Sequence, residues 1–156
     1  MPRTNAALAV GNALPATELT TADGGSTTIA ELLDGRPAVV HFMRTSTCPA
    51  CLSVGKRLAS LHRNGDLGDA RVIFLTPGTG ADAAQAASRL DETVRVAAVG
   101  PHHGVFGLRR SGQFQESATA VVDADGTVIQ VTTAAMPAKS FDRAATLDAI
   151  AQLATR

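Results

Sequence analysis

PAVVHFMRTSTCPACLSVGKRL, residues 37–58, places an apolar run, a short polar stretch and two cysteines in direct succession. The run 37–43 is nearly continuous and contains two valines, a pattern typical of a strand buried on both faces. A segment from Pro49 to about Leu61 follows, with apolar residues at helical spacing and an Asn-Gly pair after it. This stretch therefore predicts a central strand that leads through a short loop into a helix.

The first cysteine falls where this loop becomes helix. Pro49 suits the first helical position, so Cys48 is expected at or next to the N-cap. Unpaired backbone N–H groups and the positive end of the helix favour a thiolate there. Cys51 follows about one turn later, within reach of a disulfide. The spacing predicts an exposed, acidic nucleophile and a shielded resolving thiol.

Two other interpretations of the cysteine pair stay open. The cysteines could be small buried residues, or they could bind copper or zinc together with a histidine. A zinc site needs a second pair of ligands, and the four histidines form no second spaced motif. A strand–CxxC–helix context is more specific than a lone CxxC, so we expect redox chemistry without a metal or another cofactor.

Strands and helices alternate along the rest of the chain. The expected elements are a hairpin over 18–29, a helical turn over 29–33, strands over 72–75 and 94–99, a helix over 82–90, a helical turn over 104–108, a hairpin of 118–122 with 127–131, and a helix over 140–154. This order predicts an α/β fold in which right-handed crossovers join parallel strands and the late hairpin adds an antiparallel edge. We expect a mixed sheet with helices on both faces, one domain over 11–156, and a loose segment over 1–10.

Composition excludes several classes of protein. The chain has 156 residues, 45% apolar and 18% charged, as one globular domain requires. Its formal net charge is zero, which argues against a nucleic-acid partner. A chain without net charge has little protection against self-association, so the composition is compatible with a homodimer. No apolar run approaches the ~18 residues of a membrane span, and no signal peptide is recognised. The sequence predicts a cytoplasmic protein, where close cysteines indicate redox chemistry.

Several segments resemble the patterns of one family. Phe42-Met43-Arg44 followed by Cys48-Pro49-Ala50-Cys51 is similar to F-Y-R-G-x-W-C-P-x-C, and ATAVVDADG, residues 118–126, is similar to A-T-F-V-I-D-x-D-G. Weaker matches occur at 11–19, 23–32, 76–77 and 105–108. The family is the AhpC/TSA (redoxin, peroxiredoxin-like) branch of the thioredoxin superfamily. The resemblance covers about residues 10 to 155 and implies a thioredoxin-like fold with an N-terminal β-hairpin.

The resemblance also implies a reaction. In Thr45-x-x-Cys48 the threonine hydroxyl would hold a peroxide while the Cys48 thiolate attacks the O–O bond and becomes a sulfenic acid. Cys51 would then form a disulfide with Cys48, and an external dithiol such as a thioredoxin would reduce it. Arg44 follows the carboxyl end of a strand, where open α/β sheets bind ligands, and completes the predicted site. A thioredoxin-like oxidoreductase acting on protein or small-molecule disulfides is the alternative function.

The sequence departs from the family pattern at two positions. His41 stands where the family has a proline, four residues before its threonine, and we interpret it as a core histidine. Ser117 aligns with the second active-site arginine, which Arg44, Arg109 or Arg110 could replace. Thioredoxin-type reductases place a cis-proline near this same position, and neither Ser117 nor Ala118 can serve as one. We expect the pair 102–103 in a solvated loop, and 109–110 to be solvated as well.

Overall fold

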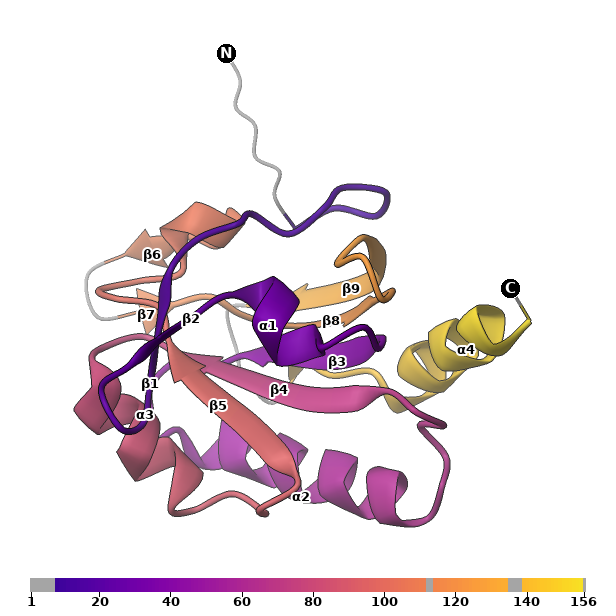
Figure 1. Cartoon of the computed structure of the whole chain (residues 1–156), viewed down its shortest axis with the longest axis horizontal. Helices are drawn as coiled ribbons and strands as arrows, with labels where there is room; N and C mark the ends of the chain where they lie inside the picture. Colours follow the sequence, from indigo (N-terminus) through magenta and orange to yellow (C-terminus); the bar gives the residue numbers. More distant parts are fainter. Residues whose placement is uncertain (1–7, 112–113, 135–138, 156) are drawn as a thin grey trace.

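The computed structural model describes residues 8–111, 114–134 and 139–155. A seven-stranded mixed sheet runs through them in the order β2-β1-β5-β4-β3-β8-β9 (Figure 1). The strands are β1 Leu19–Thr21, β2 Ser26–Thr27, β3 Ala38–Phe42, β4 Arg71–Thr76, β5 Val94–Ala98, β8 Ser117–Val122 and β9 Val128–Ala134. No helix within the described residues is long and apolar enough to cross a membrane.

Three parallel strands form the centre of the sheet. β3 pairs with β4, and β4 pairs with β5, both in parallel. β8 continues the sheet antiparallel to β3, with His41 opposite Thr119 and Phe42 opposite Ala118. The predicted late hairpin and N-terminal hairpin are both present, and the latter joins the same sheet because β1 pairs antiparallel with β5. The predicted mixed sheet is confirmed.

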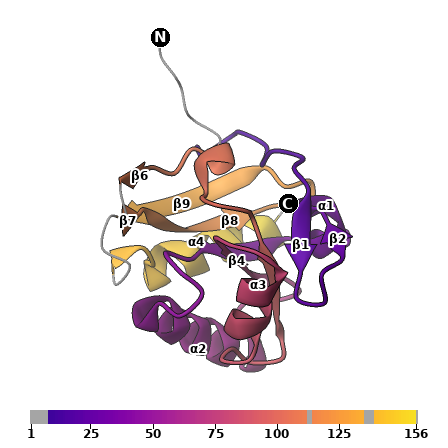
Figure 2. The same ribbon diagram turned by 90° about the vertical axis from the view of Figure 1, so that its left-hand side faces the viewer.

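Helices cover both faces of this sheet. α1 Ile29–Leu33 lies on one face, and α2 Pro49–Arg63 and α4 Arg143–Ala154 lie together on the other (Figures 1 and 2). α3 Gly80–Ala87 packs against β5, β1 and β4. The core on the α2 side includes buried residues of strands, helices and loops: Val39, Met43, Cys51, Val54, Leu58, Phe74, Val121, Phe141 and Ile150. Helices on both faces were predicted and are confirmed.

The predicted helix after the central strand begins as expected and ends two residues later. Pro49 is its first residue and Cys48 its N-cap, and it runs to Arg63 rather than to about Leu61. The helix lies close to the sheet because Gly55 has no side chain. A Cβ atom at Gly55 would lie 3.3 Å from the Phe74 ring and would also overlap Leu90. This close packing fixes the distance of α2 from β4.

One part of the fold was not predicted. The 3₁₀ turn Gly104–Phe106 falls within the expected helical turn, but it is followed by a short ribbon of β6 Arg110–Ser111 and β7 Phe114–Gln115. This ribbon is a separate two-stranded sheet, and it lies near the end of the main sheet at which β3 and β4 finish (Figure 1).

At the N-terminus, Leu8 is partly buried and packs against the core on the α1 side. Residues 1–7 of the segment expected to be loose lie outside the described residues.

Candidate active site

Three of the four predicted site residues, Arg44, Thr45 and Cys48, lie on the loop between β3 and α2, and the fourth, Cys51, lies in the first turn of α2. The Met43 N–H donates to the Leu75 carbonyl at 2.8 Å and extends the parallel pairing to the last residue before the loop. The Cys48 N–H donates to the Thr45 carbonyl at 3.3 Å and closes a tight turn before the helix. Arg44, Thr45, Cys48 and Cys51 are therefore brought together by the end of one strand and the start of one helix.

The two cysteines are free thiols whose sulfurs accept different backbone N–H groups. The Cys51 N–H donates to the Cys48 sulfur at 3.3 Å, so the Cys48 side chain caps α2. The Arg44 N–H donates to the Cys51 sulfur at 3.5 Å. Each sulfur thus has a donor from the same loop and helix turn, which fixes the relative placement of the thiols.

The thiols differ strongly in acidity. A hydrogen bond from the Cys51 thiol, together with the Cys51 backbone N–H and the Arg44 side chain, lowers the pKa of Cys48 to about 6, although burial opposes this. The hydrogen bond to Cys48 and burial raise the pKa of Cys51 well above its ordinary value. Near neutral pH the site therefore holds a thiolate at Cys48 and a protonated thiol at Cys51, the asymmetry that the sequence predicts.

The predicted exposure of Cys48 is wrong. Its relative exposure is 2%, and Cys51 is fully buried. The side chain of Cys48 turns back over the first helical turn and joins the apolar cluster that contains Met43 and Phe141, while Thr47 and Pro49 take the exposed positions. The cap that makes the thiol acidic thus also withdraws it from solvent.

A cavity of about 240 Å³ opens beside the loop 43–48 between β3 and α2, which we call the thiol loop. Its walls come from the segments that follow three parallel strands, from the first turn of α3 and from the β6–β7 ribbon: Arg44, Thr45, Ser46, Pro77, Gly78, Asp82, Pro101, Arg110 and Gln115. Two predicted site residues, Arg44 and Thr45, line this cavity. The Arg44 side chain also helps to lower the pKa of Cys48. Arg110 enters the same cavity, whereas Arg109 does not line it.

Two histidines lie buried below the loop, and only one of them was predicted there. The His41 Nδ1 lies 2.8 Å from the Thr119 hydroxyl, and burial lowers the pKa of His41 to about 3, so the predicted core histidine is confirmed. His103 was expected in a solvated loop, but it is fully buried and its Nε2 lies 2.7 Å from the Met43 carbonyl. The Gln115 side chain accepts the His103 N–H at 3.0 Å, which draws this residue inward, while His102 stays exposed.

Ser117 occupies the position at which the family carries a second arginine. Its side chain is fully buried, and its hydroxyl has no hydrogen-bond partner among the described residues. A neutral hydroxyl cannot supply the charge of a guanidinium. Of the three arginines considered as replacements, Arg44 and Arg110 line the cavity and Arg109 does not.

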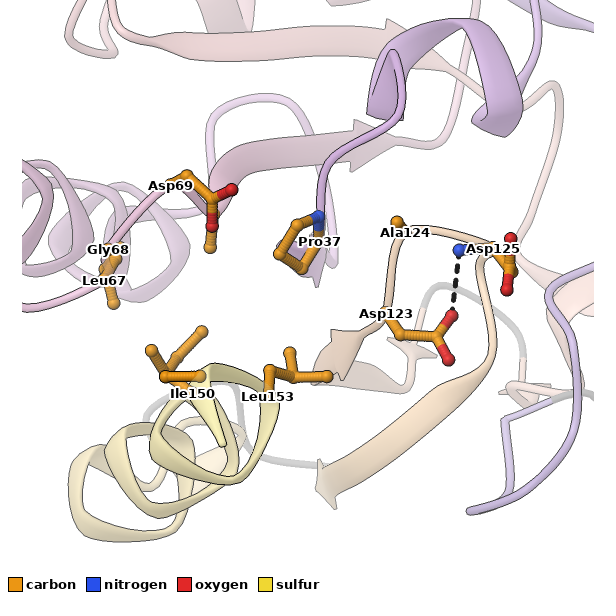
Figure 3. A pocket seen from close by; sticks show the side chains of 11 residues that line it. Pro37, Leu67, Gly68, Asp69, Asp123, Ala124, Asp125, Ile150 and Leu153 are labelled. Carbon is orange, nitrogen blue, oxygen red and sulfur yellow. Dashed lines mark hydrogen bonds between the residues drawn. The ribbon is translucent and has the colours of Figure 1, made fainter. Parts of the chain in front are cut away.

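A larger cavity, of about 330 Å³, lies at the opposite end of β3 (Figure 3). Pro37, the turn around Asp123 and the α4 residues Ile150 and Leu153 line it, and neither cysteine does. The Asp123 carboxylate in this lining serves a turn, since it accepts the Asp125 N–H at 2.9 Å. Within the described residues no group of three His, Cys, Asp or Glu side chains could hold a metal ion.

An acidic thiol that caps a helix, with a second thiol one turn later at the end of a mixed sheet, defines a thiol redox site on a thioredoxin-like fold. The model of the Redoxin family matches residues 9–150. The chain therefore belongs to the redoxin family, and the predicted family resemblance is confirmed. No curated protein matches the sequence.

Solved structures of peroxiredoxins share this fold. Peroxiredoxin 5 from Alvinella pompejana has 17% identity and a TM-score of 0.73 over 93% of this chain and 99% of its own. Peroxidoxin BcpB from Mycobacterium tuberculosis has 21% identity and a TM-score of 0.69 over 94% and 96%. Reduced Prx3 from Vibrio vulnificus, solved in complex with hydrogen peroxide, has 16% identity and a TM-score of 0.74 over 92% and 99%. These similarities confirm the predicted thioredoxin-like fold.

Proposed function

We propose that this protein is a peroxiredoxin-like thiol peroxidase that reduces hydrogen peroxide or organic hydroperoxides through Cys48. One observation carries the proposal: the residue that helps to make Cys48 acidic, Arg44, also lines a cavity together with Thr45. Membership of the redoxin family supports it. A protein of similar fold from Vibrio vulnificus, solved in its reduced form with hydrogen peroxide, supports it further.

The first step is attack of the Cys48 thiolate on the O–O bond. The sulfur donates an electron pair to one peroxide oxygen, the O–O bond breaks, and Cys48 becomes a sulfenic acid. The other oxygen leaves with the bonding electrons, takes up a proton and departs as water or an alcohol. The Arg44 guanidinium offsets the negative charge that develops on this oxygen, and the Thr45 hydroxyl provides a hydrogen bond that orients the peroxide.

The second step joins the two cysteines. Interaction with Cys48 is the largest cause of the raised Cys51 pKa. Once Cys48 is a neutral sulfenic acid its negative charge is gone, so Cys51 loses its proton more easily. The Cys51 sulfur then attacks the Cys48 sulfur, a disulfide forms, and the sulfenic oxygen leaves with a proton as water.

An external dithiol completes the cycle. It supplies two electrons and two protons, which return Cys48 and Cys51 to thiols, and a thioredoxin-type protein is the reductant we propose. A reducing, cytoplasmic setting suits such a cycle. The homodimer that the sequence allows stays a prediction.

Intact mass after peroxide treatment tests these roles. Reduced wild-type protein should lose about two mass units, as a Cys48–Cys51 disulfide requires. The Cys51→Ser variant should gain about one oxygen and keep it, and Cys48→Ser should not react. Oxidation of Cys48→Ser at the wild-type rate would contradict the assignment of Cys48 as the nucleophile.

A further inference from the structure

The cavity that Arg44 and Thr45 line is larger than hydrogen peroxide needs. Its volume is about 240 Å³, whereas a water molecule in the liquid takes up ~30 Å³. Hydrogen peroxide has two heavy atoms and would fill a small part of this space. The cavity therefore has room for an organic substituent on the peroxide.

Two guanidinium groups give this cavity its chemical character. Arg44 comes from the thiol loop and acts on Cys48 itself, whereas Arg110 comes from β6, a different element. Among the described residues that line the cavity, Asp82 is the one carboxylate. It accepts the Thr79 N–H at 2.8 Å and the Thr79 hydroxyl at 3.3 Å, and so is engaged at the start of α3. These described lining residues carry two positive charges against one negative charge, which favours an anion.

The place of Arg110 at the cavity is fixed by hydrogen bonds. Its guanidinium donates to the Pro101 carbonyl at 2.7 Å, after the end of β5. The buried Gln115 side chain donates to the Arg109 carbonyl at 3.0 Å and accepts the His103 N–H at 3.0 Å. These contacts hold the β6–β7 ribbon against segment 101–103, in which the His103 Nε2 lies 2.7 Å from the Met43 carbonyl. The Arg110 charge therefore lies at the cavity wall before a ligand arrives.

We propose, on the basis of the peroxidase function above, that this cavity selects hydroperoxides of small carboxylic acids. The carboxylate binds to the Arg110 guanidinium, because the planar guanidinium can donate two parallel hydrogen bonds to the two carboxylate oxygens. The hydroperoxide group then lies toward Thr45 and Cys48. The chemistry is unchanged: Cys48 takes one peroxide oxygen as a sulfenic acid, and the organic product leaves, with one proton, as a hydroxy acid. Arg110 is thus a substrate-binding residue that sets specificity.

A matched pair of substrates tests this selectivity. 4-Hydroperoxy-4-methylpentanoate and its amide have the same number of heavy atoms and differ in charge. In wild-type protein the acid should oxidise Cys48 about tenfold faster than the amide at low salt, a ratio expected for one charge-assisted hydrogen-bonded contact. Oxidation is followed by quenching and intact mass.

Variants of the two adjacent arginines assign the effect. Arg110→Gln should reduce the acid-to-amide ratio to about one, and Arg110→Lys should keep part of it. Arg109→Gln is the matched control, since it removes an adjacent charge that does not line the cavity, and it should keep the wild-type ratio. Thermal unfolding of each variant checks that the fold is intact.

The outcomes separate this inference from the peroxidase function. If hydrogen peroxide oxidises Cys48 rapidly but acid and amide react equally, the selectivity is refuted and the peroxidase function stands. A ratio that survives Arg110→Gln, or that is lost equally in Arg109→Gln, also overturns the role of Arg110. If no peroxide reacts faster than a small free thiol would, both proposals fail.

Discussion

The Cys51 backbone N–H donates to the Cys48 sulfur at 3.3 Å, so the nucleophile of the proposed reaction is also the N-cap of its helix. Helices are usually capped by the oxygen of Ser, Thr, Asp or Asn. Here a sulfur fills that role, and the N–H donor and positive helix end favour its thiolate form. The acidity and the placement of Cys48 follow from this one arrangement.

Removal of the Cys51 thiol should make Cys48 less acidic. The hydrogen bond from this thiol is the largest cause that lowers the Cys48 pKa to about 6. Cys51→Ala should therefore raise the Cys48 pKa, whereas Cys51→Ser keeps a donor and should raise it less. The pH dependence of alkylation by iodoacetamide, followed by intact mass, measures both. A Cys51→Ala midpoint equal to that of wild type would contradict the arrangement.

Loss of the Arg44 charge should act in the same direction. The Arg44 side chain lowers the Cys48 pKa through a hydrogen bond and through its charge. Arg44→Gln should raise this pKa and slow the reaction with hydrogen peroxide at pH 6, because less thiolate is present. Lys56→Gln, which removes an exposed positive charge from α2, is the control and should leave alkylation unchanged. Equal effects of the two changes would show a general charge effect instead.

Acid should destabilise the protein through its buried histidines. Burial lowers the pKa of His41 to about 3, so the folded protein keeps it neutral while the unfolded chain protonates it below about 6.5. The unfolded state binds more protons between these values, so stability falls as the pH drops from 6.5 toward 3. Between pH 7 and pH 4.5 the His41 contribution is about 2.5 kcal/mol.

Urea unfolding at pH 7 and pH 4.5 measures this difference. His41→Gln should lose less stability than wild type over that interval. His103, whose pKa burial lowers to about 4, acts in the same direction and remains in the variant. The exposed His102 provides the control, and His102→Gln should keep the wild-type pH dependence. Equal pH dependence in His41→Gln and wild type would refute the assignment.

A methyl group at Gly55 should weaken the contact of α2 with the sheet. The added Cβ would lie 3.3 Å from the Phe74 ring and overlap Leu90, so one of these side chains must move. We expect Gly55→Ala to destabilise the fold by about 1–3 kcal/mol despite the better helix propensity of alanine. Ser53→Ala at an exposed position of the same helix is the control. A stability gain in Gly55→Ala would show that the helix can move away from the sheet.

The sequence predicts the parts of this molecule that depend on local pattern. An apolar run, a proline after Cys48 and a second cysteine three residues later were sufficient for the strand, the start of the helix and the difference between the thiols. Local turn chemistry around Asp123 likewise predicted the late hairpin. The predicted site residues lie within one short stretch of chain, the loop before α2 and the first turn of this helix, so no long-range contact was needed to place them.

Long-range contacts account for what the sequence did not reveal. Cys48 is buried in an apolar cluster that also contains Phe141, from a segment more than 90 residues later. His103 is buried because of a hydrogen bond with Gln115. Arg110 lines the cavity because its two-residue strand, β6, pairs with β7 and places Arg110 opposite Gln115. Strands of two residues carry no recognisable periodicity, so this ribbon has no sequence signal.

The second-order rate constant for reduced protein with hydrogen peroxide, compared with that for a mixed disulfide, tests the central claim most directly. The chain has no Trp or Tyr whose fluorescence could follow the reaction, so quenched samples are measured by intact mass. A peroxidase should react with hydrogen peroxide at least 100-fold faster than a small free thiol, which corresponds to about 3 kcal/mol of transition-state stabilisation. A peroxide rate no greater than that of the small thiol, with rapid exchange on the mixed disulfide, would contradict it and identify a disulfide oxidoreductase.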